Sequence, residues 1–464
     1  FAVWYNYLLA AFVVFCGILA AIPASARITL GVDGAVPEHS TVAWLSMMFC
    51  SGIGIGILVF SVSEPVSHFL SNPDILDGSV DAGSTEAMFS ALRFVFLHWG
   101  FSAWACYAVV ALALGLACHR FGQPMTMRSA IAPLFGKRME GAVGHTVDVL
   151  SLLAIIAGIT TTIVLGIEQI CSGLFALTGN PFFSDPTGNP TLSALLTALF
   201  VAIGVVVASI ISGQNRGVKW MSQLGISLAF GVLLVFILFG GGLRVVDVLA
   251  GSTQEYIRNL PTQILSVYSP SASETSAAQR DWQNEWTIFY WAWWIAFAPF
   301  VGMFLARISY GRTIREFILG AMLAPTIMCF VWFAGTGGSA LILEVEGPAD
   351  GAILLAEHAA RIYSAADVML GDVPAYLFKI VLVVMFLVLI VTSTTAAIIA
   401  IKSIGAAGSD HAETTTHSML WAGVIAANAG AVMAIGGVHS IRDVMIVGAV
   451  PFSIVMALML ASVA

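Results

Sequence analysis

The sequence predicts an all-α polytopic membrane protein with two inverted five-helix repeats, preceded by an N-terminal extra helix or helices. The composition, a series of long apolar runs and an alternation of basic residues between loops all predict it. Hydrophobic residues make up 59% of the 464 residues and charged residues only 9%, whereas a soluble domain is about a quarter charged. A mean hydropathy of +0.94 points the same way. The net charge of −8 carries little information by itself, because charge placement in loops matters more.

The apolar runs set the number of helices. A run of about 20 residues spans the hydrocarbon core of a bilayer, and longer runs are expected to tilt or break. We therefore expect eleven membrane helices, at 3–25, 41–70, 88–118, 144–177, 192–212, 220–242, 286–306, 317–342, 374–401, 416–436 and 443–463.

Basic residues fall mainly in alternate loops. One set of loops holds eleven of the eighteen, at Arg27, Arg120, Arg128, Lys137, Arg138, Arg216, Lys219, Arg307, Arg312, Arg315 and Lys402. The other set holds only Arg244, Arg258, Arg280, Arg361 and Arg442. The positive-inside rule places the first set in the cytoplasm of a multi-pass protein of the plasma membrane, the inner membrane in a bacterium. This topology puts Phe1 outside and Ala464 inside, so we expect that a preceding helix is missing.

Ten of the eleven runs divide into two sets of five with opposite starting orientation, as in an inverted repeat. External stretches at 244–260 and 349–366 are too short to span and are expected to be interfacial helices. The expected organisation is an extra helix and cytoplasmic loop at 1–40, a first repeat at 41–242, an extracellular connection at 243–285 and a second repeat at 286–464.

A glycine run interrupts the first helix of the first repeat. Gly52, Gly54 and Gly56 alternate in the sequence CSGIGIGILVF, which weakens a helix strongly. Unwinding there would free backbone amides for a carboxylate and carbonyls for a cation. Close packing of small residues explains the pattern equally well.

Aromatic residues gather in two helices. Five of the twelve tryptophans lie between Asp281 and Pro299, and a second group contains Trp99, Trp104 and Tyr107. Indole faces attract a desolvated cation, which favours a bulky onium ligand, a methylated ammonium or sulfonium. For any one of these residues, the alternative is an anchor at the membrane interface.

Hydroxyls supply the third pattern. Thr392, Ser393, Thr394 and Thr395 are consecutive, and Thr160, Thr161 and Thr162 repeat the pattern. Such groups offer oxygen ligands to a small hard cation, although hydroxyls in membrane helices commonly bond their own backbone.

Ionisable residues in or beside the spans are functional candidates, because burying them in lipid is costly. Pairing at helix ends explains most of them as well. They are Glu64, Arg93, His98, Asp148, Glu168 and Glu285. The spans lack the paired carboxylates and nucleophile motifs of an intramembrane enzyme, so we expect no enzymatic activity. The six cysteines have no metal-ligand spacing and are assigned no chemistry.

Taken together, these motifs resemble the betaine-choline-carnitine transporter family. The segment EWTIFYWAWWIAFAPFVGMFLARISYGRTIREF is similar to that family's signature nearly end to end. The GIGIG run before Ser63-Glu64-Pro65, the HW pair with Trp104 and Tyr107, and VTS at 391–393 match in order, so the resemblance covers essentially the whole chain.

The resemblance implies an amino-acid/sodium symporter-like fold of twelve helices and a homotrimer in the lipid membrane. It also implies secondary transport of an onium substrate through an aromatic cage, formed by Trp99, Trp104, Tyr107, Trp293 and Trp294 and flanked by Trp291 and Phe289. The substrate-binding set further includes Phe297, where betaine carriers usually have tryptophan, and Gly52, Ile53, Gly54 and Gly56, with Ile53 where the family commonly has methionine.

For coupling, the resemblance implies sodium as the coupling ion and no other cofactor. The sodium ligands would come from Cys50, Ile53, Leu389, Ile390, Thr392 and Ser393. The exchangers of the family carry an arginine in the helix matching 144–177, whereas no Lys or Arg occurs between Arg138 and Arg216.

The absence of acidic residues between Val42 and Ser63 favours zwitterions such as glycine betaine, carnitine or dimethylsulfoniopropionate, whose carboxylates would meet freed amides. We therefore expect sodium symport of such a compound into the cell, with no nucleic-acid partner. The alternatives are proton-coupled symport of choline or a related onium compound, and an osmosensor that binds the ligand without transport.

Overall fold

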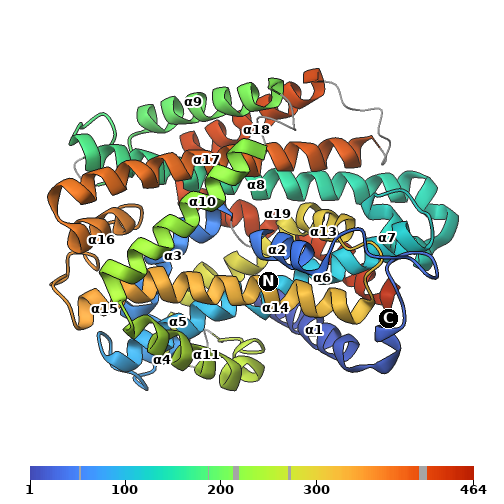
Figure 1. Ribbon diagram of the computed structural model, residues 1–464, viewed down its shortest axis with the longest axis horizontal. Coiled ribbons are helices and arrows are strands. Elements are labelled where there is room, and N and C mark those ends of the chain that lie inside the picture. Colours follow the sequence, from blue (N-terminus) through green and yellow to red (C-terminus); the bar gives the residue numbers. More distant parts are fainter. Residues whose placement is uncertain (52–53, 186–187, 213–218, 270–272, 407–414) are drawn as a thin grey trace.

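The computed structural model describes residues 1–464 except 52–53, 186–187, 213–218, 270–272 and 407–414, and the side chains of 49–51 and 437–440. The described residues form helices joined by loops, with isolated β-bridges only at Thr29–Thr313 and Ser184–Pro190 (Figure 1). In lipid the backbone must satisfy its own hydrogen bonds, so these apolar runs become helices. The predicted all-α class is confirmed.

Ten helical stretches in the described residues are long and apolar enough to span a membrane. They are Ala2–Ala21 (α1), Thr85–Arg120 (containing α5 and α6), Ala142–Thr178 (α8), Leu192–Ile211 (α9), Lys219–Gly241 (containing α10), Glu274–Arg307 (containing α12 and α13), Ile314–Val345 (containing α14 and α15), Asp372–Gly405 (α17), Thr415–Ile435 (α18) and Ile441–Val463 (in α19). The run at 41–70 is the eleventh predicted span. It is divided into α2 (Thr41–Ser51) and α3 (Ile55–Leu70).

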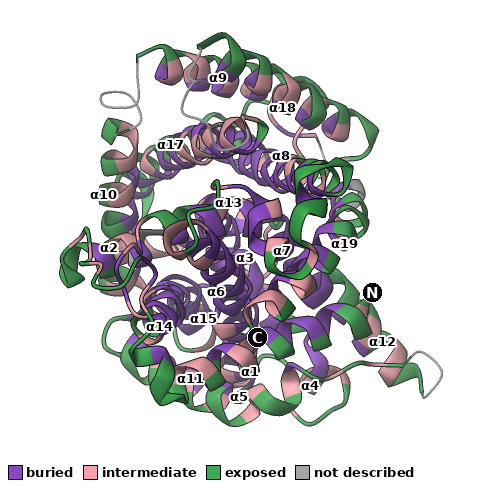
Figure 2. Cartoon of the chain, turned by 90° about the vertical axis from the view of Figure 1, so that its right-hand side faces the viewer, coloured by how far each residue is buried: buried purple, intermediate pink, exposed green. Residues whose placement is uncertain are grey.

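Third and fourth helices of the two predicted repeats pair with each other. α8 packs against α17, and α9 packs against α18 along one edge of the molecule (Figure 1). On the inner side of this layer, α3, α6 (Phe101–Gly115) and α13 (Phe289–Arg307) form the most deeply buried part of the fold (Figure 2). This arrangement places the tryptophan-rich helix and the interrupted helix next to each other at the centre.

Proline and threonine together shape α3. Pro65 lies inside the helix and has no amide to bond the carbonyl of Ser61, one turn earlier. The hydroxyl of Thr336 donates to that carbonyl at 3.2 Å from a π-helical turn, Ala334–Gly338. A Cβ on Gly337 would meet the Cβ of Pro65 at 2.8 Å, so glycine permits the close approach. A second chain segment thus satisfies the carbonyl that the proline frees.

Loop contacts sort into the two sets that the basic residues predict. In the predicted cytoplasmic set, Arg312 bonds Thr41 at 3.1 Å, and Arg307 bonds Ser403 at 2.8 Å. On the opposite side, Arg244 pairs with Glu346 at 2.6 Å. These contacts therefore join residues within one set of loops and not between the two sets.

Of the two interfacial helices predicted outside the spans, one forms as expected and the other only in part. The interfacial helix expected at 244–260 is α11 (Arg244–Gln263), whereas the one expected at 349–366 is only partly correct, because residues 349–360 form turns and α16 begins at Arg361. The carboxylate of Glu344 accepts backbone amides from this loop, including that of Ile353 at 2.7 Å, and holds it in turns. The remaining helices are α4 (Pro73–Leu76), α7 (Met127–Phe135), α12 (Glu274–Gln283) and α16 (Arg361–Leu370).

Candidate functional site

α13 carries two tryptophans of the aromatic cage side by side. The rings of Trp293 and Trp294 lie 5.6 Å apart between centroids and only 5° from parallel. Trp291 points to another part of the molecule, where its indole N–H donates to the Asn6 side chain of α1 at 2.7 Å. α13 therefore presents a pair of stacked indoles on one face and anchors α1 with a third indole.

A break between α5 (Thr85–Trp99) and α6 supplies the other half of the cage. Gly100 separates the two helices, and a Cβ there would come 2.9 Å from the Tyr256 hydroxyl. The last turn of a helix leaves carbonyls without intrahelical partners. Trp104 donates to the carbonyl of Trp99 at 3.1 Å, and Trp294 donates to that of His98 at 2.8 Å. The break thus fixes two indoles of the cage.

The rings of the two halves meet. Trp99 packs edge to face against Trp294 at 4.8 Å and against Trp293 at 6.5 Å between centroids. Tyr107 meets Trp294 at 6.1 Å and Trp104 at 5.4 Å. The five predicted cage residues therefore converge from separate elements, and all five are buried.

The interrupted helix contributes the third wall. Gly54 is extended, with φ −120° and ψ 174°, and α3 begins directly after it, so the helix is unwound at this glycine. A Cβ on Gly56 would lie 2.8 Å from Trp293 and 3.2 Å from Trp99, so only glycine admits both rings. Gly52 and Ile53 lie outside the described residues, as does the side chain of Cys50.

One cavity of about 420 Å³ joins these walls. Its described lining comprises the five cage residues and Ala103, Gly54, Ile55, Gly56 and Ile57 of the interrupted helix, Leu389, Thr392, Ser393 and Ala396 of α17, Met47, Thr162, Ser222, Gly225 and Ile226, and Phe297, Phe300, Val301 and Phe304 of α13. The last four follow α13 toward Arg307, so the cavity extends from the cage toward the predicted cytoplasmic end.

The hydroxyls of α17 bond partly to their own helix. Thr392 donates to the carbonyls of Val388 and Leu389, both at 3.1 Å, and Thr395 donates to that of Val391 at 2.8 Å. Thr392 and Ser393 nevertheless line the same cavity as Gly54, together with Leu389. Ile390 is fully buried, and its side chain faces Gly166 of α8. Residues of α17, two of them with hydroxyl groups, and residues of the interrupted helix thus line the same cavity.

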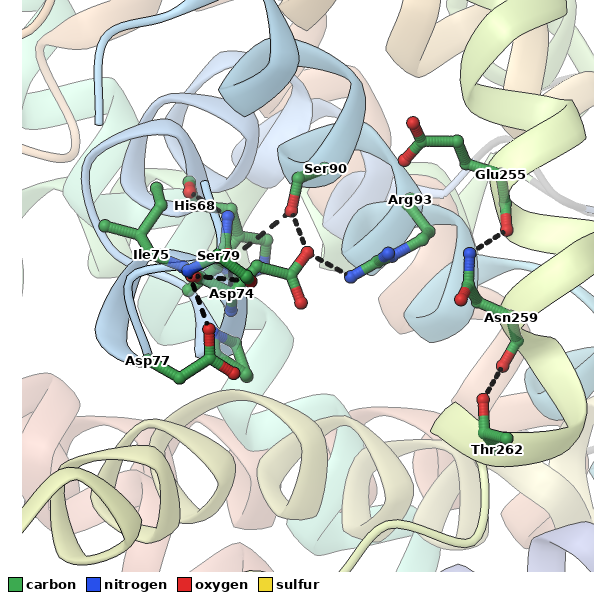
Figure 3. A network of polar contacts seen from close by, with 12 residues as sticks. His68, Asp74, Ile75, Asp77, Ser79, Ser90, Arg93, Glu255, Asn259 and Thr262 are labelled. Carbon is green, nitrogen blue, oxygen red and sulfur yellow. Dashed lines mark hydrogen bonds and ion pairs between the residues drawn. The ribbon is translucent and has the colours of Figure 1, made fainter. Parts of the chain in front are cut away.

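Three of the six ionisable residues named above, Arg93, Asp148 and Glu285, form ion pairs. Arg93 pairs with Asp74, to which Ser90 also donates at 2.6 Å (Figure 3). Arg128 pairs with Asp148 at 3.0 Å. Glu285 likewise accepts from Arg442 at 2.7 Å. Glu64 and His98 differ, because both are fully buried directly behind the cage.

Sequence reasoning missed several residues that line the cavity or pack on its walls. Phe300 and Phe304 continue the stripe of Phe297 at intervals of three and four, so helical periodicity would have found them. Phe60 packs on Trp293 at 5.8 Å between centroids, one turn beyond Gly56. Ser222 and Gly225 come from α10 (Lys219–Val235), and no local pattern marks them.

A family model described as the betaine/carnitine/choline family transporter matches residues 1–464. A glycine betaine transporter of Bacillus subtilis is 33% identical over 465 residues, covering 99% of this chain and 85% of that protein. A glycine betaine/proline/choline/ectoine transporter of Vibrio parahaemolyticus is 33% identical, covering 94% and 74%. A high-affinity choline transport protein of Escherichia coli is 34% identical, covering 81% and 52%.

Among solved structures, a Na⁺-coupled sialic acid symporter in a substrate-bound outward-open state is similar to this chain. The match has a TM-score of 0.51 at 13% identity and covers 98% of this chain and 86% of that one. At this identity the likeness concerns the fold alone.

Proposed function

The chain belongs to the betaine/carnitine/choline family of transporters, and from this premise we propose that it imports a zwitterionic quaternary ammonium or sulfonium compound by sodium symport. It is a multi-pass membrane protein and a secondary transporter of the betaine and choline type, not an enzyme. The observation that carries the proposal is the convergence of five aromatic rings on one cavity, which the interrupted helix and α17 also line.

The cage suits an onium headgroup. A cation is attracted to a ring within about 6 Å of its centroid, by roughly 0.5–2 kcal/mol per ring depending on desolvation. Because the centroids of Trp99 and Trp293 are 6.5 Å apart, one headgroup reaches both rings at once. Ammonium and sulfonium groups share this chemistry, so glycine betaine, carnitine and dimethylsulfoniopropionate all fit.

Two features support a carboxylate on the substrate. The indole N–H of Trp293 is buried and has no partner among the described residues, which leaves a donor beside the cage. The chain is also unwound at Gly54, where an amide is freed from helical bonding. A carboxylate accepting such donors forms charge-assisted hydrogen bonds, stronger than neutral ones.

Sodium is the coupling ion we propose. Leu389, Thr392 and Ser393 line the same cavity as Gly54 of the unwound segment, and carbonyl and hydroxyl oxygens suit a small hard cation. In this proposal Ile390 contributes its carbonyl, and Cys50 and Ile53 supply the remaining oxygens from their backbone.

Uptake into proteoliposomes tests the proposal. Labelled glycine betaine is supplied with an inward sodium gradient, an inward proton gradient, or neither, at fixed membrane potential. We expect accumulation only with sodium. Uptake that responds to neither the sodium gradient nor the proton gradient would reject symport. Specific binding without uptake would indicate an osmosensor.

Proton-coupled symport of choline or a related compound is the second candidate. The buried carboxylate of Glu64 favours it, because a carboxylate behind the cage is a group on which a proton can travel. In the same assay, accumulation driven by the proton gradient alone would select this candidate.

We also propose that the transporter assembles as a homotrimer in the lipid membrane. α11 supports an interface, because Val246 and Ile257 expose apolar surface on this helix. The mass of the detergent-solubilised protein, measured by light scattering, tests this assembly, and a monomer mass would contradict it.

A further inference from the structure

A fully buried carboxylate lies behind the aromatic cage. Glu64 stands on α3, and its two oxygens have four hydrogen-bonding partners. One oxygen lies 2.7 Å from His98 Nδ1 and 3.3 Å from His68 Nε2, within hydrogen-bond distance of both rings. The other accepts from the Trp99 indole at 2.8 Å and from the Tyr290 hydroxyl at 2.5 Å. Three helices, α3, α5 and α13, therefore meet on this one side chain.

The donor pattern fits the ionised form of Glu64. An ionised carboxylate has about four acceptor sites and no donor, and all four are filled here when each histidine carries its proton on the nitrogen that faces Glu64. The outer nitrogen of His98 lies 3.1 Å from the Thr287 hydroxyl, which satisfies a neutral ring. His68 Nδ1 has no partner among the described residues, as suits the bare nitrogen of a second neutral ring. The cluster then carries one negative charge.

Nearby cations do not neutralise this charge by contact. Arg361 donates to the carbonyl of Ser63 at 2.9 Å and to the hydroxyl of Ser67 at 2.7 Å. Arg442 pairs with Glu285 at 2.7 Å, and its guanidinium lies over Trp286. In the described part of the chain, the recorded partners of the Glu64 carboxylate are the two histidines, the indole and the phenol.

The carboxylate is coupled directly to the cage. It holds the N–H edge of Trp99, whose ring packs on both stacked indoles of α13. It also holds Tyr290, whose ring stacks on Trp294 at 5.8 Å. An anion bonded to an indole N–H pushes electron density into the ring, and its field acts over several ångströms in a site with little water.

We propose that Glu64 is the buried counter-charge of the onium site, which makes the cage select a cationic headgroup over a neutral one of the same shape. This inference rests on the proposed function and deepens it. Glu64 acts through Trp99 and Tyr290, without touching the ligand, so it is a positioning and selectivity residue. It also supplies negative charge that the glycine run itself lacks.

A pair of isosteric ligands tests the charge. Glycine betaine and 3,3-dimethylbutanoate differ in one atom of the headgroup, a cationic nitrogen or a neutral carbon. Their affinities for the purified full chain are measured by titration calorimetry. We expect Glu64→Gln to reduce the preference for glycine betaine over the carbon isostere by about tenfold, since only the cation interacts with the lost charge. Glu64→Asp should retain the preference while weakening both ligands.

Controls separate the outcomes. Glu344→Gln changes another glutamate that accepts several donors, remote from the cage, and should leave the preference unchanged. Tyr290→Phe keeps the ring but removes one of the two groups through which Glu64 acts. It should therefore also reduce the preference for glycine betaine, which can be measured even if Glu64→Gln does not fold. An unchanged preference in folded Glu64→Gln, or in Tyr290→Phe when Glu64→Gln does not fold, would overturn the inference. Absence of glycine betaine binding in the unmodified protein would overturn the proposed function instead.

Discussion

At the scale of single residues, the smallest side chain sets the size of the cage. Gly56 lies against Trp293 and Trp99 at distances that leave no room for a methyl group. We expect Gly56→Ala to weaken onium binding about tenfold, since overpacking costs about 1–3 kcal/mol and displaces the rings. Gly204→Ala in α9 is the matched control, because a Cβ there meets nothing within 4 Å and the residue does not line the cavity. Equal losses in the two variants, measured by ligand titration, would contradict the steric explanation.

The ring of Trp294 meets three of the other four cage rings, those of Trp99, Tyr107 and Trp293. It also stacks on Tyr290. Replacing it with leucine removes a π-face and the indole bond to the α5 terminus. Binding of glycine betaine should weaken at least about tenfold. Trp220→Leu, at a residue with 72% exposure, controls for loss of a tryptophan. Unchanged affinity in Trp294→Leu would remove the aromatic role.

The cage residues were predictable because they lie in a long signature with strong local spacing. Glu64 was recognised only as one ionisable residue among six. Its role depends on partners 34 and 226 positions away, His98 and Tyr290, which no local pattern relates to it. Trp291 is the opposite case. It is close in sequence to the cage residues and was predicted beside them, but in the structure its indole bonds Asn6 of α1.

At the scale of elements, α17 offers hydroxyls to the cavity in a fixed register. Ser393→Ala should raise the sodium concentration needed for half-maximal uptake by about tenfold. The hydroxyl oxygen would contact a charged ion, and hydrogen bonds to charged groups contribute about 1.5–3 kcal/mol. Thr395→Val is the control, since that hydroxyl bonds Val391 within its own helix. A sodium dependence that shifts equally in both variants would argue against an α17 site.

Element boundaries were predictable where apolar length decides them and less so where tertiary contacts do. The interruption at Gly54 was one of two interpretations of the alternating glycines, beside close helix packing. The break at Gly100 was not foreseen, because one glycine in an apolar run is a weak signal and the break depends on crowding by Tyr256. The turns at 349–360 likewise depend on Glu344, which competes with helical bonding by accepting their amides.

At the scale of the whole molecule, the described lining residues of the cavity reach toward one end of α13, where Phe304 is 37% exposed. Phe289, at the other end of α13, is 1% exposed. With Cys118 first replaced by serine, Phe304→Cys should react with a thiol reagent applied from the cytoplasmic side, and Phe289→Cys should be protected. The opposite pattern would contradict a cavity that opens inward. A rocking of one helix bundle against the rest would then exchange the two accessibilities during transport.

A density map of the protein with bound glycine betaine tests the central claim most directly, namely that indoles of two separate helical elements form the onium site. The account predicts the trimethylammonium nitrogen within about 6 Å of the ring centroids of Trp99 and Trp293 together. A saturating ligand found elsewhere, with these rings still packed on each other as in the free protein, would contradict it.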